Sequence, residues 1–214
     1  DKVAVDRHSF LMMKLRNLLP GIHVWSRFNE EKQMDFNGHV IELGHGTTLL
    51  TDPPQTEYQT LEAIADLGKV AAIILTNRDH RRDAEHFRKR FSAPLWGPDL
   101  DAPLIEIPLD RRIRDGEKLF DRFTVISLQH QKSPGEFAMH DPVPRSMIIG
   151  YAVIGKGPGR LNLLPVEKIP NPEGAKESLR RLLSYDFEHL VIGDGTAILD
   201  RGKSALEEFL APAH

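Results

Sequence analysis

The pattern of apolar and polar positions predicts a strand-rich first part of the chain with helices between later strands. Residues 24–28 alternate in polarity, and two further runs, 38–43 and 47–51, flank a glycine-rich turn typical of a β-hairpin. Apolar residues then recur at helical spacing from Tyr58 to Leu67. The continuously apolar run Val70 to Leu75 follows and predicts a strand that is buried on both faces. This succession of strand, helix and strand favours an α/β fold.

The rest of the chain is predicted to form short, mostly antiparallel strands between helices. The predicted helices cover about 83–91, about 172–185 and about 203–210, and a buried strand is expected at 189–192. Further strands are expected at 94–96, 104–107, 118–120, 123–128, 137–140 and 147–150. No linker or low-complexity tract interrupts the 214 residues, so we expect a single domain over 1–214.

Composition narrows the classes of partner. A formal net charge of −3 gives no general attraction to nucleic acid or to an anionic membrane, and no such partner is expected. No apolar run reaches the roughly 20 residues of a membrane span, and residues 1–7 do not resemble a signal peptide. A cytoplasmic location is therefore expected, and an exposed strand edge or helix would allow a homodimer. Because the chain has no cysteine, disulfides and thiolate metal sites are excluded.

The polar segment directly after the buried strand is the strongest candidate for a site. Residues 76–83 read Thr-Asn-Arg-Asp-His-Arg-Arg-Asp. In α/β sheets, ligands gather at the carboxyl ends of strands, where this segment lies. We therefore expect a pocket at this end of the sheet, with an unidentified small molecule as its partner.

The order of these motifs resembles the metallo-β-lactamase superfamily over about residues 22–210. The resemblance rests on Asp52 after a strand, Thr76 with its polar cluster, the turn from Ser133 to Glu136, Gly150, and Gly193-Asp194-Gly195. It implies a four-layer α/β/β/α sandwich with the site along one edge of the paired sheets. Most members of that superfamily are zinc hydrolases.

The positions that hold metal in the family carry other residues in this chain. In the family motif T-H-x-H-x-D-H, an ungapped match places Asn77 and Asp79 at the first two histidines, and Arg81 and Arg82 at the final Asp-His pair. If this chain lacks two residues of the motif, Asp79 and His80 match the final Asp-His pair instead. The three later ligand positions carry Lys132, Tyr151 and Asp194. A guanidinium cannot bind a metal ion, so a dinuclear zinc site is not expected and no cofactor is predicted.

Three interpretations of this altered site are open. In the first, Lys132 replaces the metal as the cation among Asp52, Asp79 and Asp194, with Arg81 or Arg82 nearby. The protein then binds a small molecule, or has an unassigned activity, in the ancestral pocket. The candidate catalytic residues are Asp79, His80 and Lys132, and the pocket candidates are Asp52, Asn77, Arg81, Ser133, Tyr151 and Asp194.

The second interpretation is a hydrolase of esters, thioesters or lactones that uses one divalent metal ion. Zinc, iron or manganese would be held by Asp79, His80 and Asp194, and a metal-bound water would attack the carbonyl. In the third interpretation the charged residues are simply solvated side chains of loops.

Overall fold

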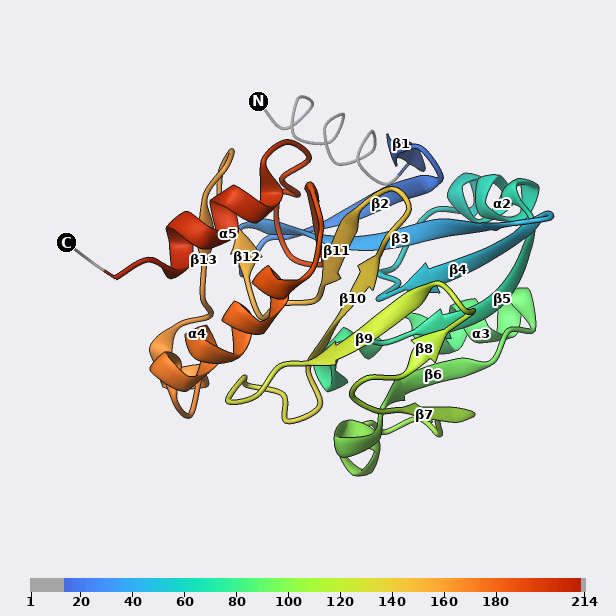
Figure 1. The fold of residues 1–214 in the computed structure, drawn as a ribbon. Helices are drawn as coiled ribbons and strands as arrows, with labels where there is room; N and C mark the ends of the chain where they lie inside the picture. Colours follow the sequence, from blue (N-terminus) through green and yellow to red (C-terminus); the bar gives the residue numbers. More distant parts are fainter. Residues whose placement is uncertain (1–13, 213–214) are drawn as a thin grey trace.

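A computed structural model describes residues 14–212, which form two β-sheets with helices on their outer faces (Figure 1). The first sheet contains, in spatial order, β1 (Arg16–Leu19), β2 (Ile22–Asn29), β3 (Met34–Gly44), β4 (Thr47–Thr51), β5 (Lys69–Ile74), β6 (Leu95–Pro98) and β7 (Arg111–Ile113). The second contains β14 (His189–Ile192), β11 (Ser146–Ile149), β10 (Phe137–Asp141), β9 (Phe123–Ser127) and β8 (Lys118–Leu119). A separate pair joins β12 (Ile154–Gly155) to β13 (Leu161–Asn162). The helices are α2 (Tyr58–Leu67), α3 (Ala84–Phe91), α4 (Pro172–Arg180) and α5 (Gly202–Leu210).

Strand direction places several strand ends at one edge of the sandwich. In the first sheet β4, β5, β6 and β7 run parallel to one another, whereas β1 to β4 are antiparallel. In the second sheet β14 is parallel to β11. The loops that follow β4, β5, β11 and β14 therefore meet, because parallel strands bring their carboxyl ends to the same edge.

Three apolar layers hold the sandwich together. Side chains from both sheets meet in the middle layer, among them Ile41 and Ala72 from the first sheet and Phe123 and Phe137 from the second. The outer layer of the first sheet packs its strands against α2 and α3, and that of the second packs its strands against α4 and α5. The predicted four-layer α/β/β/α fold is confirmed.

The strand that leads to the site is buried as the sequence predicts. In β5, Ile74 faces the layer between the sheets and Ile73 faces the layer beneath α2 and α3. The hairpin of β3 and β4 and the helix α2 also lie where they are expected. Gly68 ends α2 at φ 138°, and a Cβ there would lie 2.2 Å from the carbonyl oxygen of Gly46. Only glycine fits this close approach.

Other elements differ from the prediction. The strand expected at 104–107 is absent, and a 3₁₀ turn, Asp99–Leu104, and an irregular segment replace it. The buried Asp101 carboxylate explains this, because it accepts hydrogen bonds from the backbone N–H groups of Arg78 and Gly135 and fixes the turn. Helix α4 ends at Arg180, earlier than expected, and a 3₁₀ turn continues it. The sequence does not predict the short strands β1, β7 and β13.

Within residues 14–212, no helix combines the length and apolar character that a membrane crossing requires. The prediction about residues 1–7 concerns residues outside this range.

Candidate functional site

Asp52 and Thr76 join the ends of two neighbouring strands at the base of the site. Asp52 follows β4 and Thr76 follows β5. The Asp52 carboxylate accepts a hydrogen bond from the backbone N–H of Thr76 at 2.8 Å and another from its hydroxyl at 2.7 Å. Both residues are almost completely buried. They form a fixed support for the loop that carries the functional side chains.

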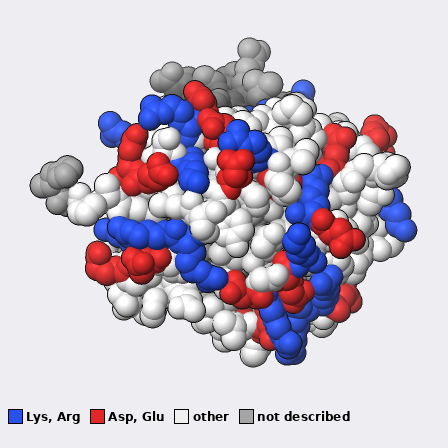
Figure 2. All heavy atoms as spheres, viewed as in Figure 1, with Lys and Arg blue, Asp and Glu red and all other residues white. Residues whose placement is uncertain are grey.

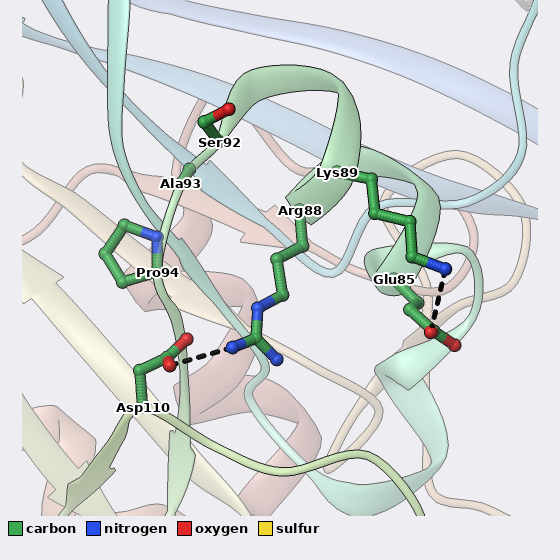
Figure 3. A pocket seen from close by; sticks show the side chains of 7 residues that line it. All are labelled: Glu85, Arg88, Lys89, Ser92, Ala93, Pro94 and Asp110. Carbon is green, nitrogen blue, oxygen red and sulfur yellow. Dashed lines mark hydrogen bonds and ion pairs between the residues drawn. The ribbon is translucent and has the colours of Figure 1, made fainter.

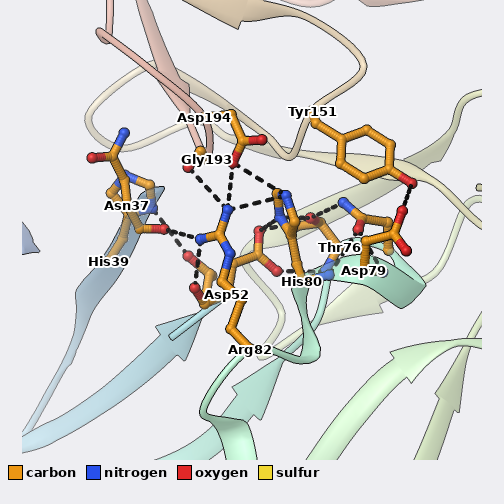
Figure 4. A network of polar contacts seen from close by, with 12 residues as sticks. Asn37, His39, Asp52, Thr76, Asp79, His80, Arg82, Tyr151, Gly193 and Asp194 are labelled. Atoms are coloured by element: carbon orange, nitrogen blue, oxygen red, sulfur yellow. Dashed lines mark hydrogen bonds and ion pairs between the residues drawn. The ribbon is translucent and has the colours of Figure 1, made fainter. Parts of the chain in front are cut away.

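The loop after β5 is shaped by Asn77. Its side-chain oxygen accepts hydrogen bonds from the backbone N–H groups of Asp79 (3.1 Å) and His80 (3.0 Å), which caps a 3₁₀ turn, Arg78–Arg81. Arg82 then adopts φ 33°, outside the regions that most side-chain-bearing residues prefer. This reversal of the chain brings the Arg82 side chain back toward His80 (Figure 4).

His80 lies between two carboxylates. Its Nδ1 is 3.0 Å from Asp52 and its Nε2 is 3.3 Å from Asp194, and its side chain is only 3% exposed. Burial and the nearby Arg82 lower the pKa of His80, but Asp52 and Asp194 outweigh them and raise it to about 9. His80 is therefore protonated near neutral pH, with an N–H directed at each carboxylate.

The guanidinium of Arg82 occupies the centre of the site and is 9% exposed (Figure 4). Its Nη1 donates to the carbonyl oxygens of Asn37 (2.9 Å) and Asp52 (3.0 Å). Its Nη2 donates to the carbonyl oxygen of Gly193 (3.3 Å) and to the Asp194 carboxylate. One arginine thus ties β3 to the ends of β4 and β14, and with His80 it balances the two buried carboxylates.

Asp79 faces away from this centre and binds two other side chains. Its Oδ2 accepts hydrogen bonds from Lys132 Nζ at 2.5 Å and from the Tyr151 hydroxyl at 2.8 Å. Burial raises the pKa of Asp79, but the hydrogen bonds from Lys132 and Tyr151 outweigh burial and lower it. Asp79 is therefore a carboxylate that holds an ammonium and a phenol at the floor of the pocket.

Glu136 lies behind Tyr151 and is fully buried. Its Oε1 accepts hydrogen bonds from the backbone N–H groups of Tyr151 and Ala152, both at 3.2 Å, while its Oε2 has no partner among the described residues. Burial raises its pKa well above the ordinary value of a glutamate. Gly150 packs against the same group, because a Cβ there would lie 2.7 Å from Oε1 and 2.4 Å from Thr76 Oγ1.

His39 on β3 is a second buried histidine beside the site. Its Nδ1 is 3.2 Å from the hydroxyl of Thr51. Burial lowers the pKa of His39 to about 4, although the charge of Asp52 acts in the opposite direction. His39 is therefore neutral where His80 is charged.

A cavity of about 670 Å³ opens above these residues. Five of the predicted site residues line it: Asp79, His80, Lys132, Tyr151 and Asp194. The other residues that line it are Asn29, Glu31, Lys32, Met34, Phe36, Arg82, Ile154, Lys156, Asn162, Leu163, Leu164, Pro165 and Lys168.

The remaining predicted pocket residues lie elsewhere. Asp52, Asn77 and Ser133 are buried beneath the cavity, where Ser133 donates a hydrogen bond to Asp101. Arg81, expected in the pocket, points away from it and pairs with the exposed Glu106 at 2.5 Å. The reversal of the chain at Arg82 explains this correction, since it turns the second of the two arginines into the site.

Of the three carboxylates that the sequence assigns to Lys132, Asp79 alone pairs with it among the described residues, and Asp52 and Asp194 interact with His80 and Arg82. Sequence reasoning gave Arg82 too little weight. The signal was present, because Arg82 stands at the last histidine of the family motif in the ungapped match.

A second cavity, of about 540 Å³, lies beside α3 on another part of the surface (Figure 3). Its basic residues are already paired: Arg88 with Asp110 at 2.8 Å and Lys89 with Glu85 at 3.1 Å. Basic and acidic side chains are also interspersed over the face of the molecule drawn in Figure 2. The basic character of α3 is therefore largely compensated by neighbouring acids.

The fold is that of known metallo-β-lactamases. VMB-1 superposes with a TM-score of 0.74 at 16% identity, covering 92% of this chain and 94% of VMB-1. A metallo-β-lactamase from Hirschia baltica gives a TM-score of 0.72 at 15% identity, covering 94% of this chain and 99% of that protein. A metallo-β-lactamase from Pontibacter korlensis gives a TM-score of 0.73 at 14% identity, covering 92% of this chain and 96% of that protein. At such identities these matches define the fold and not the activity.

A family model described as the metallo-β-lactamase superfamily matches residues 13–213, so the chain belongs to that superfamily. A comparison with curated proteins gives no significant match. Within residues 14–212, no group of three or more His, Cys, Asp or Glu side chains is arranged to hold a metal ion.

Proposed function

We propose that this member of the superfamily binds a small molecule in the pocket without a metal ion, and that Arg82 and His80 supply the positive charge at its floor. The observation that carries the proposal is the position of Arg82. Its guanidinium contacts His80 and Asp194, the groups that would otherwise face a metal ion.

The donor set does not fit a metal. His80 directs its two ring nitrogens at Asp52 and Asp194, and the Arg82 guanidinium lies 3.1 Å from Nε2, where a metal ion would have to bind. A bound cation would also meet the positive charge of Arg82 at close range. Asp79, the third member of the predicted single-metal site, is engaged by Lys132 and Tyr151. No observation on these residues favours the single-metal hydrolase, and we derive no reaction step through a metal.

The protein cations have a different chemistry from a metal ion. A guanidinium stays protonated at all ordinary pH values and only donates hydrogen bonds. His80, with its pKa at about 9, is a poor general base near neutral pH. The floor of the pocket is thus suited to holding a ligand by hydrogen bonds and charge, which supports binding over hydrolysis.

Metal analysis tests the proposal. We expect purified protein to contain far less than one equivalent of zinc, iron or manganese, and its thermal midpoint to be unchanged by added zinc or by a chelator. A metal ion whose free concentration is 100 times its Kd would stabilise the fold by about 2.7 kcal/mol, and a melting curve detects a change of this size easily. Stoichiometric metal that disappears in His80→Gln and Asp194→Asn would refute the proposal. Traces of zinc retained by both variants would be bound elsewhere on the surface.

A further inference from the structure

The charge of the pocket is opposite to that of the whole protein. Five Lys or Arg side chains line the cavity against three carboxylates, so the lining carries an excess of two positive charges. The complete chain has a formal net charge of −3. A concave site of one sign with low-dielectric walls concentrates ligands of the opposite sign.

The cations of the pocket are not equivalent. Arg82 and Lys132 are paired with Asp194 and Asp79, and Lys32 is paired with Glu31. Lys156 and Lys168 also line the cavity, and neither forms an ion pair with a described residue, although the charge of Lys168 acts on the carboxylate of Glu31. Both are exposed, and neither is needed to balance a buried carboxylate. These two lysines hold positive charge that no ion pair with a described residue fixes in place, so it can meet a ligand.

Part of the wall of the cavity is apolar. Met34 and Phe36 from β3 contribute to it, as do Ile154 of β12 and the segment Leu163 to Pro165 after β13. Met34, Phe36, Leu163 and Leu164 are only partly buried by the protein itself. A volume of about 670 Å³ is typical of sites for small organic molecules, which combine apolar walls with a few charged groups.

We infer that the ligand is an organic anion with an apolar body: its carboxylate or phosphate meets Lys156 and Lys168, and its hydrocarbon part lies against Phe36 and Leu163. This inference rests on the proposed function, since it places the ligand in the pocket that Arg82 closes from below. Arg82 and Lys132, the paired cations at the floor, orient polar atoms of the ligand. Lys156 and Lys168 select a ligand that carries negative charge.

A matched pair of fluorescent probes tests the inference. 8-Anilinonaphthalene-1-sulfonate carries an anionic group, and N-phenyl-1-naphthylamine has the same aromatic body without it. We expect the sulfonate to bind one per chain, as measured by titration calorimetry. The double variant Lys156→Ala with Lys168→Ala should weaken it about tenfold, and binding of the neutral probe should not change. Lys118→Ala, at an exposed position of strand β8, is the control and should leave both probes unaffected.

Competition then identifies the anionic group. Displacement of the sulfonate probe by octanoate points to a carboxylate ligand, and displacement by octyl phosphate points to a phosphate. Equal displacement by octylamine, or displacement by none of these, overturns the inference. It is also overturned if the lysine variants weaken both probes equally, or if the sulfonate does not bind. These outcomes are distinct from failure of the proposed function, which is marked by stoichiometric metal that depends on His80 and Asp194.

Discussion

Replacing Arg82 with methionine is the most direct test of how the site is held together. Methionine keeps most of the length of the side chain and removes its charge and donors. The change leaves the Asp194 carboxylate with one cationic partner, His80, in place of two. It also removes one hydrogen-bond donor from each of three backbone carbonyl groups, those of Asn37, Asp52 and Gly193, of which Gly193 keeps the N–H of Asn37 as a donor.

The size of the loss follows from burial. The side chains of Arg82 and Asp194 are 9% and 10% exposed, so solvent screens their interaction little. Removing one partner of a buried ion pair costs about 3 to 5 kcal/mol, and this range is expected because Asp194 loses one of its two cations while three carbonyl contacts are lost as well. For a protein of this size each kcal/mol corresponds to about 2 to 4 °C, which predicts a fall in Tm of roughly 6 to 20 °C.

The neighbouring residue provides a matched control. Arg81 pairs with Glu106, and these side chains are 44% and 74% exposed. Exposed ion pairs contribute about 0 to 1 kcal/mol, so Arg81→Met should have a small effect. Urea denaturation of the two variants gives both free energies of unfolding. If the two variants agree within about 0.5 kcal/mol, Arg82 does not hold the site together and the reasoning is refuted.

A double-mutant cycle with Asp194→Asn separates the ion pair from the carbonyl contacts. Asp194→Asn removes the charge that Arg82→Met leaves with His80 as its one cationic partner, so the double variant should lose less stability than the sum of the single variants. A coupling of about 1 to 3 kcal/mol is expected for residues in direct contact. Additive losses would assign the effect to the carbonyl contacts and not to the ion pair.

Two further predictions concern the buried neighbours of this pair. The pKa of His80 is raised from 6.5 to about 9, so its stabilising contribution, about 3 kcal/mol, is complete below pH 6.5 and is lost as the pH rises through 9. Urea denaturation at pH 6.5 and pH 9.5 measures this loss, which should largely vanish in His80→Gln; an equal loss in that variant would contradict the prediction. Gly150→Ala should cost about 1 to 3 kcal/mol, because the new Cβ would lie 2.4 Å from Thr76 Oγ1. Thermal unfolding checks this against Gly97→Ala, whose Cβ meets a flexible side-chain end at 3.1 Å and should cost less.

The sequence predicts the frame of the site because that frame depends on local patterns. The apolar run of β5 and the polar residues after it locate the loop, and the comparison of motif positions identifies Asp79, Lys132 and Asp194. The choice between Arg81 and Arg82 is not a local property. Both have the same chemistry, and the φ angle of 33° at Arg82 decides which side chain enters the site.

The unpaired lysines could not be predicted for a related reason. Lys156 follows β12 and Lys168 ends a 3₁₀ turn, Val166–Lys168, and neither belongs to a motif. They come to the same cavity only because β12 and the chain after β13 fold over the end of the sandwich. Their significance depends on which carboxylates are near them, and this is a property of the tertiary structure alone.

The division between paired and unpaired cations separates stability from recognition. Arg82 and His80 balance buried carboxylates, so changing either should alter the free energy of unfolding whether or not a ligand is present. Lys156 and Lys168 balance no buried charge, so changing them should alter ligand affinity and leave the unliganded protein as stable as before. A metal ion at this position would combine both roles, because one cation would hold the strand ends and contact the substrate. Under the proposed function, the two roles fall on different side chains of this chain, and each is expected to be removable without the other.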